Sequence, residues 1–246
     1  MIPLLVGLGV LILAASLAFS WPRTGFAALA FLLALLAHLA ATRELLASPF
    51  QTAMLFASGL VGLGRTYAWR PRLGPLVRAL YAAAALVALL GLHYLGRVAE
   101  GLPLWILVLH VGSFLIAYSA LTLAFLSALF GYRQHLVLKR APWAAARRPP
   151  LAVLMGLEEP YLRAGYLAYT LGLFTGMAWA FRLWGAALSW DPKEVATLVA
   201  WGLFTLRLLL PPSARPGLRL FVFALAFLAM AVAFFAAPLF GGRHPV

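Results

Sequence analysis

The amino-acid sequence predicts an all-α fold, a polytopic integral membrane helix bundle of about eight transmembrane helices. Of its 246 residues, 65% are hydrophobic and 10% are charged, whereas soluble domains contain roughly 25% charged residues. The mean hydropathy is +0.98, and apolar runs of about 20 residues, the length that crosses a bilayer, recur along the chain. This composition excludes an ordinary water-soluble domain. Because no polar block is long enough to form a second domain, we predict a single transmembrane domain over residues 1–246.

Eight apolar runs define the expected membrane spans. The first begins with Met1-Ile2-Pro3, which lacks the basic residues of a cleaved signal peptide. The longest polar stretch, Gly131 to Arg163, is expected to be a cytoplasmic loop that could include a short interfacial helix and whose charges contact anionic lipid. The expected spans are residues 3–20, 24–41, 49–64, 76–95, 102–130, 161–180, 193–210 and 218–238.

The basic residues predict the orientation of these spans. The net charge is +13, and in membrane proteins excess arginine and lysine marks the cytoplasmic loops. With both termini on the outer side, 14 of the 19 basic residues fall on the inner side, so the charge reflects topology and not a nucleic-acid surface. The inner residues are Arg23, Arg65, Arg70, Arg72, Arg78, Arg133, Lys139, Arg140, Arg147, Arg148, Arg163, Arg207, Arg215 and Arg219.

The five histidines are unevenly distributed in this topology. His38, His93 and His110 fall in the outer halves of their helices, His244 lies in the outer tail, and His135 is inside. A polar residue within a span is costly in hydrocarbon and usually faces the bundle interior or a cofactor. For any single histidine, a hydrogen bond between packed helices is as good an explanation as metal ligation.

A tryptophan-rich outer loop is expected between the sixth and seventh spans, at about residues 179–194. Membrane interfaces are enriched in tryptophan, which explains single residues but not three within twelve positions. Asp191 suits the N-cap and Pro192 the first turn of the next helix, so the loop should present a rigid aromatic surface. Such a surface suits a large, planar, apolar ligand, and nearby imidazoles could coordinate a metal at the centre of that ligand. Haem has both the planar ring and the metal. The three tryptophans are Trp179, Trp184 and Trp190.

The run from Trp184 to Glu194 resembles the tryptophan-rich "WWD" signature of the CcsA/ResC family, the haem-handling subunits of system II cytochrome c synthases. Other stretches agree in order. Residues 105–121, which contain His110, resemble the family segment with the histidine before the loop, and residues 172–180 resemble its lead-in helix. Residues 238–244 resemble the segment with the histidine after the loop.

This resemblance implies that haem b (iron protoporphyrin IX) binds under the outer loop between two axial histidines. The tryptophans would line the macrocycle, and a basic side chain of the loop would pair with the propionates, an assignment made from charge. The implied metal ligands are His110 and His244, and the other implied cofactor-binding residues are Trp179, Trp184, Trp190, Asp191, Arg182 and Lys193.

The resemblance also implies a function. The family presents haem to the thiols of a Cys-X-X-Cys-His motif in apocytochrome c, with a ResB/CcsB-type membrane subunit as partner, at the outer face of the bacterial inner (plasma) membrane. This sequence has no cysteine, so the thiols must belong to the substrate. We therefore expect the haem-presenting subunit of a cytochrome c synthase (haem lyase), with no covalent catalyst of its own.

One departure and two alternatives remain. Larger relatives have a further histidine in the helix after the loop, a candidate ligand for a second haem site within the membrane. This sequence has Leu209 at that position, and His38 or His93 could substitute for the missing histidine. A membrane regulator of haem biosynthesis similar to HemX would share the fold and the loop. A transporter or anchoring subunit would use the tryptophans only as interface residues and would not copurify with haem.

Overall fold

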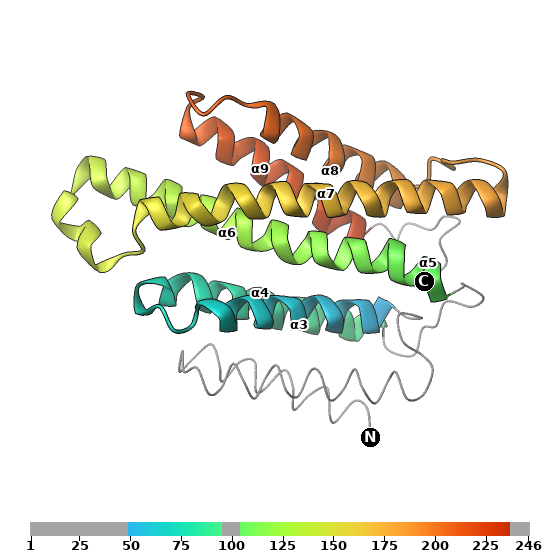
Figure 1. Cartoon of the computed structure of the whole chain (residues 1–246), viewed down its shortest axis with the longest axis horizontal. Helices are drawn as coiled ribbons and strands as arrows, with labels where there is room; N and C mark the ends of the chain where they lie inside the picture. Colours follow the sequence, from blue (N-terminus) through green and yellow to red (C-terminus); the bar gives the residue numbers. More distant parts are fainter. Residues whose placement is uncertain (1–48, 95–103, 237–246) are drawn as a thin grey trace, which may run out of the picture. The chain divides into compact units, whose positions relative to one another are not determined.

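The computed structural model describes residues 49–94 and 104–236 (Figure 1). Within these ranges the chain forms helices and no strand, which confirms the all-α prediction for this part of the protein. The expected spans 3–20 and 24–41, together with His38 and His244, lie outside the described residues. The helices form two compact units, which are considered separately below.

Three of the described helices are long and apolar enough to cross a membrane, namely Pro71–Tyr94, Val108–Arg140 and Pro216–Phe235. These helices are consistent with a membrane protein, while the count of eight spans and the outer position of both termini stay predictions. The elements are α3 (Pro49–Tyr67), η1 (Pro71–Leu73), α4 (Gly74–Gly91), η2 (Leu92–Tyr94), α5 (Leu104–Ile106), η3 (Leu107–Val111), α6 (Gly112–Arg140), η4 (Pro142–Arg147), α7 (Leu151–Trp184), α8 (Pro192–Leu209), α9 (Pro216–Ala231) and η5 (Val232–Ala236).

The first unit contains the hairpin of α3 and α4. Two glycines allow these helices to approach closely: a Cβ on Gly64 would lie 2.5 Å from the Tyr81 ring, and one on Gly91 would lie 2.6 Å from the Ala53 Cβ. Small residues at helix crossings provide close packing in membranes, where the hydrophobic effect does not drive helices together.

The second unit is an antiparallel arrangement of α6 up to Tyr132, α7 from Leu157, α8 and α9. Aromatic rings connect these helices along their length. Phe114 meets Tyr169 edge to face at 5.0 Å between ring centroids, and Phe125 stacks on Phe227 at 4.5 Å. Phe204 meets Phe223 edge to face at 6.1 Å between ring centroids, and both are fully buried.

The predicted cytoplasmic loop at residues 131–163 is wrong in extent. Helix α6 continues to Arg140, a short helix η4 follows, and α7 begins at Leu151. No proline or glycine interrupts residues 132–141, so nothing in the chain ends α6 earlier. At the start of α7, Leu154 and Leu162 are buried, so packing stabilises turns that composition alone assigned to a loop.

Candidate functional site

His110 lies in a π-helical segment, Leu107–Val111, immediately before α6. Its Nδ1 is 2.8 Å from the carbonyl oxygen of Gly172 on α7. Because a carbonyl oxygen only accepts hydrogen bonds, Nδ1 must bear the hydrogen, and Nε2 then carries the lone pair of the neutral ring. Histidines that ligate metals commonly donate their other ring N–H to a backbone carbonyl in this way. The bond is also the interhelical hydrogen bond that the sequence left as an alternative.

Two glycines on α7 make room for the segment around His110. A Cβ on Gly176 would collide with the imidazole ring, lying 2.7 Å from its Nδ1, and a Cβ on Gly172 would lie 3.0 Å from the Phe114 ring. The Phe114 ring meets the imidazole edge to face, with centroids 5.1 Å apart. The imidazole is therefore fixed on three sides, by the carbonyl, by Gly176 and by Phe114. The sequence signal for this arrangement is the Gly-x-x-x-Gly spacing, which marks close helix packing.

The tryptophan-rich loop is shorter than expected. Helix α7 continues through Trp179 and ends at Trp184, where Gly185 has φ +70° and donates its N–H to the Phe181 carbonyl at 2.9 Å. A glycine in this conformation commonly ends a helix. The non-helical part is residues 185–191, so two of the three tryptophans lie on the last turns of α7 and both are half-buried. Only the indole of Trp190 is largely exposed.

The start of α8 confirms the expected cap. Asp191 is the N-cap, its buried Oδ1 accepts the Glu194 N–H at 2.8 Å, and Pro192 occupies the first turn. Glu194, which the sequence analysis did not single out, reaches back across the cap. Its Oε2 accepts the N–H groups of Ser189 at 2.6 Å and Trp190 at 2.8 Å, and its Oε1 accepts the Ser189 hydroxyl at 3.0 Å. The spacing Asp-x-x-Glu is similar to a capping box and is the signal that identifies this residue.

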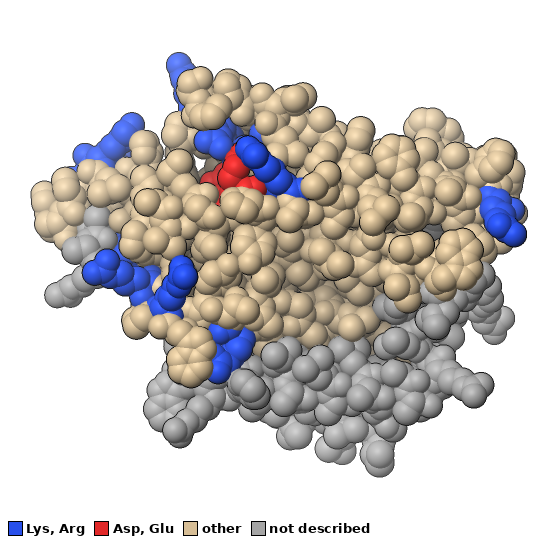
Figure 2. Space-filling model, viewed as in Figure 1, with Lys and Arg blue, Asp and Glu red and all other residues tan. Residues whose placement is uncertain are grey.

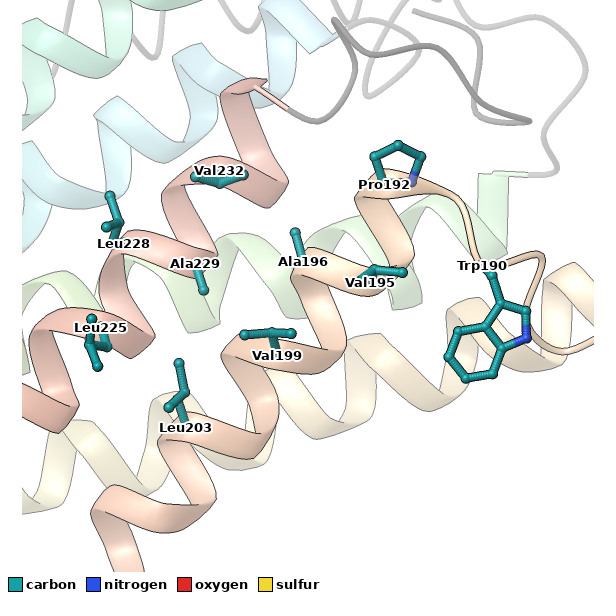
Figure 3. A pocket seen from close by; sticks show the side chains of 10 residues that line it. All are labelled: Trp190, Pro192, Val195, Ala196, Val199, Leu203, Leu225, Leu228, Ala229 and Val232. Atoms are coloured by element: carbon teal, nitrogen blue, oxygen red, sulfur yellow. The ribbon is translucent and has the colours of Figure 1, made fainter.

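An apolar groove of about 700 Å³ runs between α8 and α9 and ends at the loop (Figure 3). Val195, Val199 and Leu203 line it from α8, and Leu225 and Leu228 line it from α9. Figure 3 shows the Trp190 indole at the loop end, beside the first turn of α8. With these walls the groove suits only an apolar part of a ligand.

The basic residues expected near the propionates are at the same end of the unit. Arg182 is exposed on the last turn of α7, and Lys193 lies in the first turn of α8, where it interacts electrostatically with the Asp191 carboxylate. His93 is exposed in the other unit, beside Tyr94. In residues 49–94 and 104–236 no group of three or more His, Asp or Glu residues could hold a metal ion.

The opposite end of the second unit holds a group of charges that the sequence analysis did not predict (Figure 2). Arg207 of α8 is 1% exposed and is hydrogen-bonded to Glu158 of α7. Arg219 of α9 lies 3.7 Å from Glu159, which also pairs with Arg163 at 3.5 Å. In Figure 2 the two carboxylates form an acidic patch with basic side chains beside it. An arginine within an expected span is the sequence signal, since such a residue needs a partner.

Fold and site together define a helical membrane protein with a histidine and a tryptophan-rich loop at one end of a four-helix unit. The chain belongs to the cytochrome c assembly protein family, whose model matches residues 4–242. This membership confirms the resemblance found in the sequence.

The individual relatives match over short stretches. The cytochrome c biogenesis protein CcsA of Synechococcus sp. (strain RCC307) is 38% identical over 65 residues, which are 26% of this chain and 19% of the relative. CcsA of Gloeobacter violaceus (strain ATCC 29082 / PCC 7421) is 39% identical over 61 residues, which are 24% of this chain and 18% of the relative. CcsA of Cyanidium caldarium is 40% identical over 48 residues, which are 20% of this chain and 16% of the relative. The matched stretches thus span less than a fifth of these relatives' length.

Proposed function

We propose that the protein binds haem b at the tryptophan-rich end of its second unit and presents it to apocytochrome c, as the haem-presenting subunit of a cytochrome c synthase. The hydrogen bond from His110 Nδ1 to the Gly172 carbonyl carries this proposal, because it makes Nε2 the nitrogen that can ligate iron. Family membership supports the role, since the relatives are named cytochrome c biogenesis proteins.

In this proposal His110 and His244, the latter outside the described residues, would hold the haem iron. The rings of Trp179, Trp184 and Trp190 contact the macrocycle. Arg182 or Lys193 pairs with the propionates at the exposed edge of the haem. Asp191 acts indirectly, because its carboxylate caps α8 and fixes the start of that helix.

The chemistry requires positioning more than catalysis by side chains. Each thiol of the Cys-X-X-Cys-His motif adds across a haem vinyl group, so that sulfur bonds to one vinyl carbon and the thiol proton goes to the other. Holding vinyl and thiol together replaces an encounter in solution with a reaction between fixed groups. The protein contributes the axial ligands and the aromatic surface, while a ResB/CcsB-type subunit is its partner. The site faces outward from the bacterial inner membrane.

The visible spectrum of the purified full-length chain tests the proposal. We expect low-spin haem bands in the wild type that His110→Ala and His244→Ala each weaken, and that added imidazole restores in His110→Ala. His135→Ala is the matched control, because that histidine is predicted to lie on the inner side, away from the tryptophan-rich loop, and it should leave the bands unchanged.

Two results would contradict the proposal. The first is a wild-type protein that binds no haem even after reconstitution, which would favour a regulatory or anchoring role. The second is a set of bands that His135→Ala weakens as much as His110→Ala does, because the ligand would then not be at the tryptophan-rich end.

A further inference from the structure

Trp190 has an unusual backbone conformation. Its φ is +59°, the one positive φ of a non-glycine residue in the described ranges. This left-handed region is unfavourable for L-residues because Cβ approaches the following carbonyl oxygen. Bulky side chains are rarely found there. Burial of the side chain does not compensate for it, since the residue is 71% exposed.

The Glu194 carboxylate is the group that stabilises this conformation. It accepts the backbone N–H groups of both Ser189 and Trp190 on one oxygen and the Ser189 hydroxyl on the other. Hydrogen bonds to an ionised carboxylate are stronger than those between neutral groups. Successive N–H groups that converge on one anion are also typical of a residue in the left-handed region.

A membrane-interface role does not explain the conformation. Tryptophan at an interface is common, but an interfacial indole needs no positive φ and no carboxylate beneath it. Strained residues persist where the surroundings hold them, and they are concentrated at functional sites. The indole held here lines the loop end of the apolar groove between α8 and α9.

We propose that Glu194 is a positioning residue that holds Trp190 in the left-handed conformation and so fixes its indole at the end of this groove. The role of the fixed indole rests on the proposed function, since the indole would be the surface against which the haem ring lies. The positioning itself is a property of the haem-free protein and is tested there.

The first experiment observes Trp190 directly. The full-length chain, which has eight tryptophans, is labelled with 5-fluorotryptophan, and Trp190→Phe identifies the Trp190 signal in the ¹⁹F NMR spectrum. We expect Glu194→Ala to shift or broaden this signal without haem, while signals from tryptophans remote from the loop stay in place. Glu194→Gln keeps an amide oxygen for the N–H groups and should restore most of the wild-type position. An unchanged Trp190 signal in Glu194→Ala would overturn the proposal.

The second experiment tests the strain. Glu194→Ala is made in three backgrounds: wild type, Trp190→Ala and Trp190→Gly. Alanine removes the indole but keeps the strained Cβ, whereas glycine adopts positive φ without cost. We expect Glu194→Ala to lower Tm by similar amounts in the first two backgrounds and by clearly more in the third, because release of the backbone strain offsets part of the lost hydrogen bonding only where residue 190 has a Cβ. Equal losses in all three would mean that Glu194 only caps α8.

A haem titration separates this inference from the proposed function. If the wild type binds haem, Glu194→Ala should weaken binding about tenfold, as loss of groups that orient a binding residue does. If the wild type binds none, the proposed function fails while the NMR and Tm results still decide the positioning. Wild-type affinity in Glu194→Ala together with a displaced Trp190 signal would overturn the link between the indole and haem.

Discussion

His110 illustrates how a neighbouring backbone defines the chemistry of a side chain. The Gly172 carbonyl selects the ring nitrogen that bears hydrogen, and Gly176 provides the space that the imidazole occupies. The carbonyl also accepts the Thr175 hydroxyl at 3.0 Å. A histidine orientation set in this way needs no bound metal, so the residue is preorganised in the apo protein.

Gly176→Ala should disturb His110 without removing it. The new Cβ would collide with the imidazole, and such overpacking costs about 1–3 kcal/mol of unfolding free energy. We expect lower stability in detergent and weaker low-spin haem bands. Gly156→Ala is the matched control on the same helix, because no atom lies within 4 Å of its added Cβ. Wild-type haem bands in Gly176→Ala would show that the close packing of His110 is unnecessary for haem ligation.

At the scale of elements, α7 is the helix on which both ends of the second unit depend. It pairs with α8 through polar groups along its length: Tyr166 bonds to Thr205 at 2.8 Å, and the Trp201 Nε1–H donates to Thr170 at 3.0 Å. Interhelical hydrogen bonds of this kind stabilise membrane bundles by about 0.6 kcal/mol each. An ion pair between the buried Arg207 and the part-buried Glu158 also couples the two helices, and loss of Glu158 would leave the buried Arg207 without its nearest carboxylate.

Glu158→Ala should destabilise the second unit strongly. It removes the nearest carboxylate from the buried Arg207, and breaking a buried pair costs about 3 kcal/mol or more. Glu159→Ala is the comparison, because that carboxylate is 37% exposed and lies farther from Arg207, at 3.8 Å, so its loss should cost less than the loss of Glu158. Unfolding in detergent, followed by circular dichroism, measures both. Equal effects of the two variants would mean that Arg207 does not depend on Glu158.

The extent of these elements could be predicted only in part. Apolar periodicity located α3, α4, α8 and α9 within a few residues, and the cap of α8 followed from Asp191 and Pro192. The charged turns of α7 were assigned to a loop because their partners, Arg207 and Arg219, are distant in sequence. For the same reason the Gly-x-x-x-Gly spacing indicates close packing at Gly172 but not its partner, since His110 is 62 residues away. The positive φ of Trp190 has no sequence signal, since bulky residues rarely adopt it.

At the scale of the whole molecule, the predicted topology can be tested cleanly because the chain contains no cysteine. Single cysteines at Ala187, in the tryptophan-rich loop, and at Ser213, in the exposed turn after α8, report opposite ends of the second unit. We expect an impermeant maleimide to label Ala187→Cys in intact cells and Ser213→Cys only after permeabilisation. The reverse pattern would place the loop in the cytoplasm and would contradict both the topology and the proposed presentation of haem outside.

The length of α7 has a consequence for how the protein sits in its membrane. Arg163 and Arg182 enclose an uncharged stretch that spans about 28 Å at 1.5 Å per residue, close to the hydrocarbon thickness of about 30 Å. In the predicted topology, in which residues 161–180 cross the membrane, these two arginines lie at its two faces and their separation matches one bilayer thickness. In a thicker or thinner bilayer the helix should change its tilt, and the turn that ends at Trp184 would change its depth with it. Lipid composition is then a variable that sets how far the aromatic end of the protein stands from the headgroups.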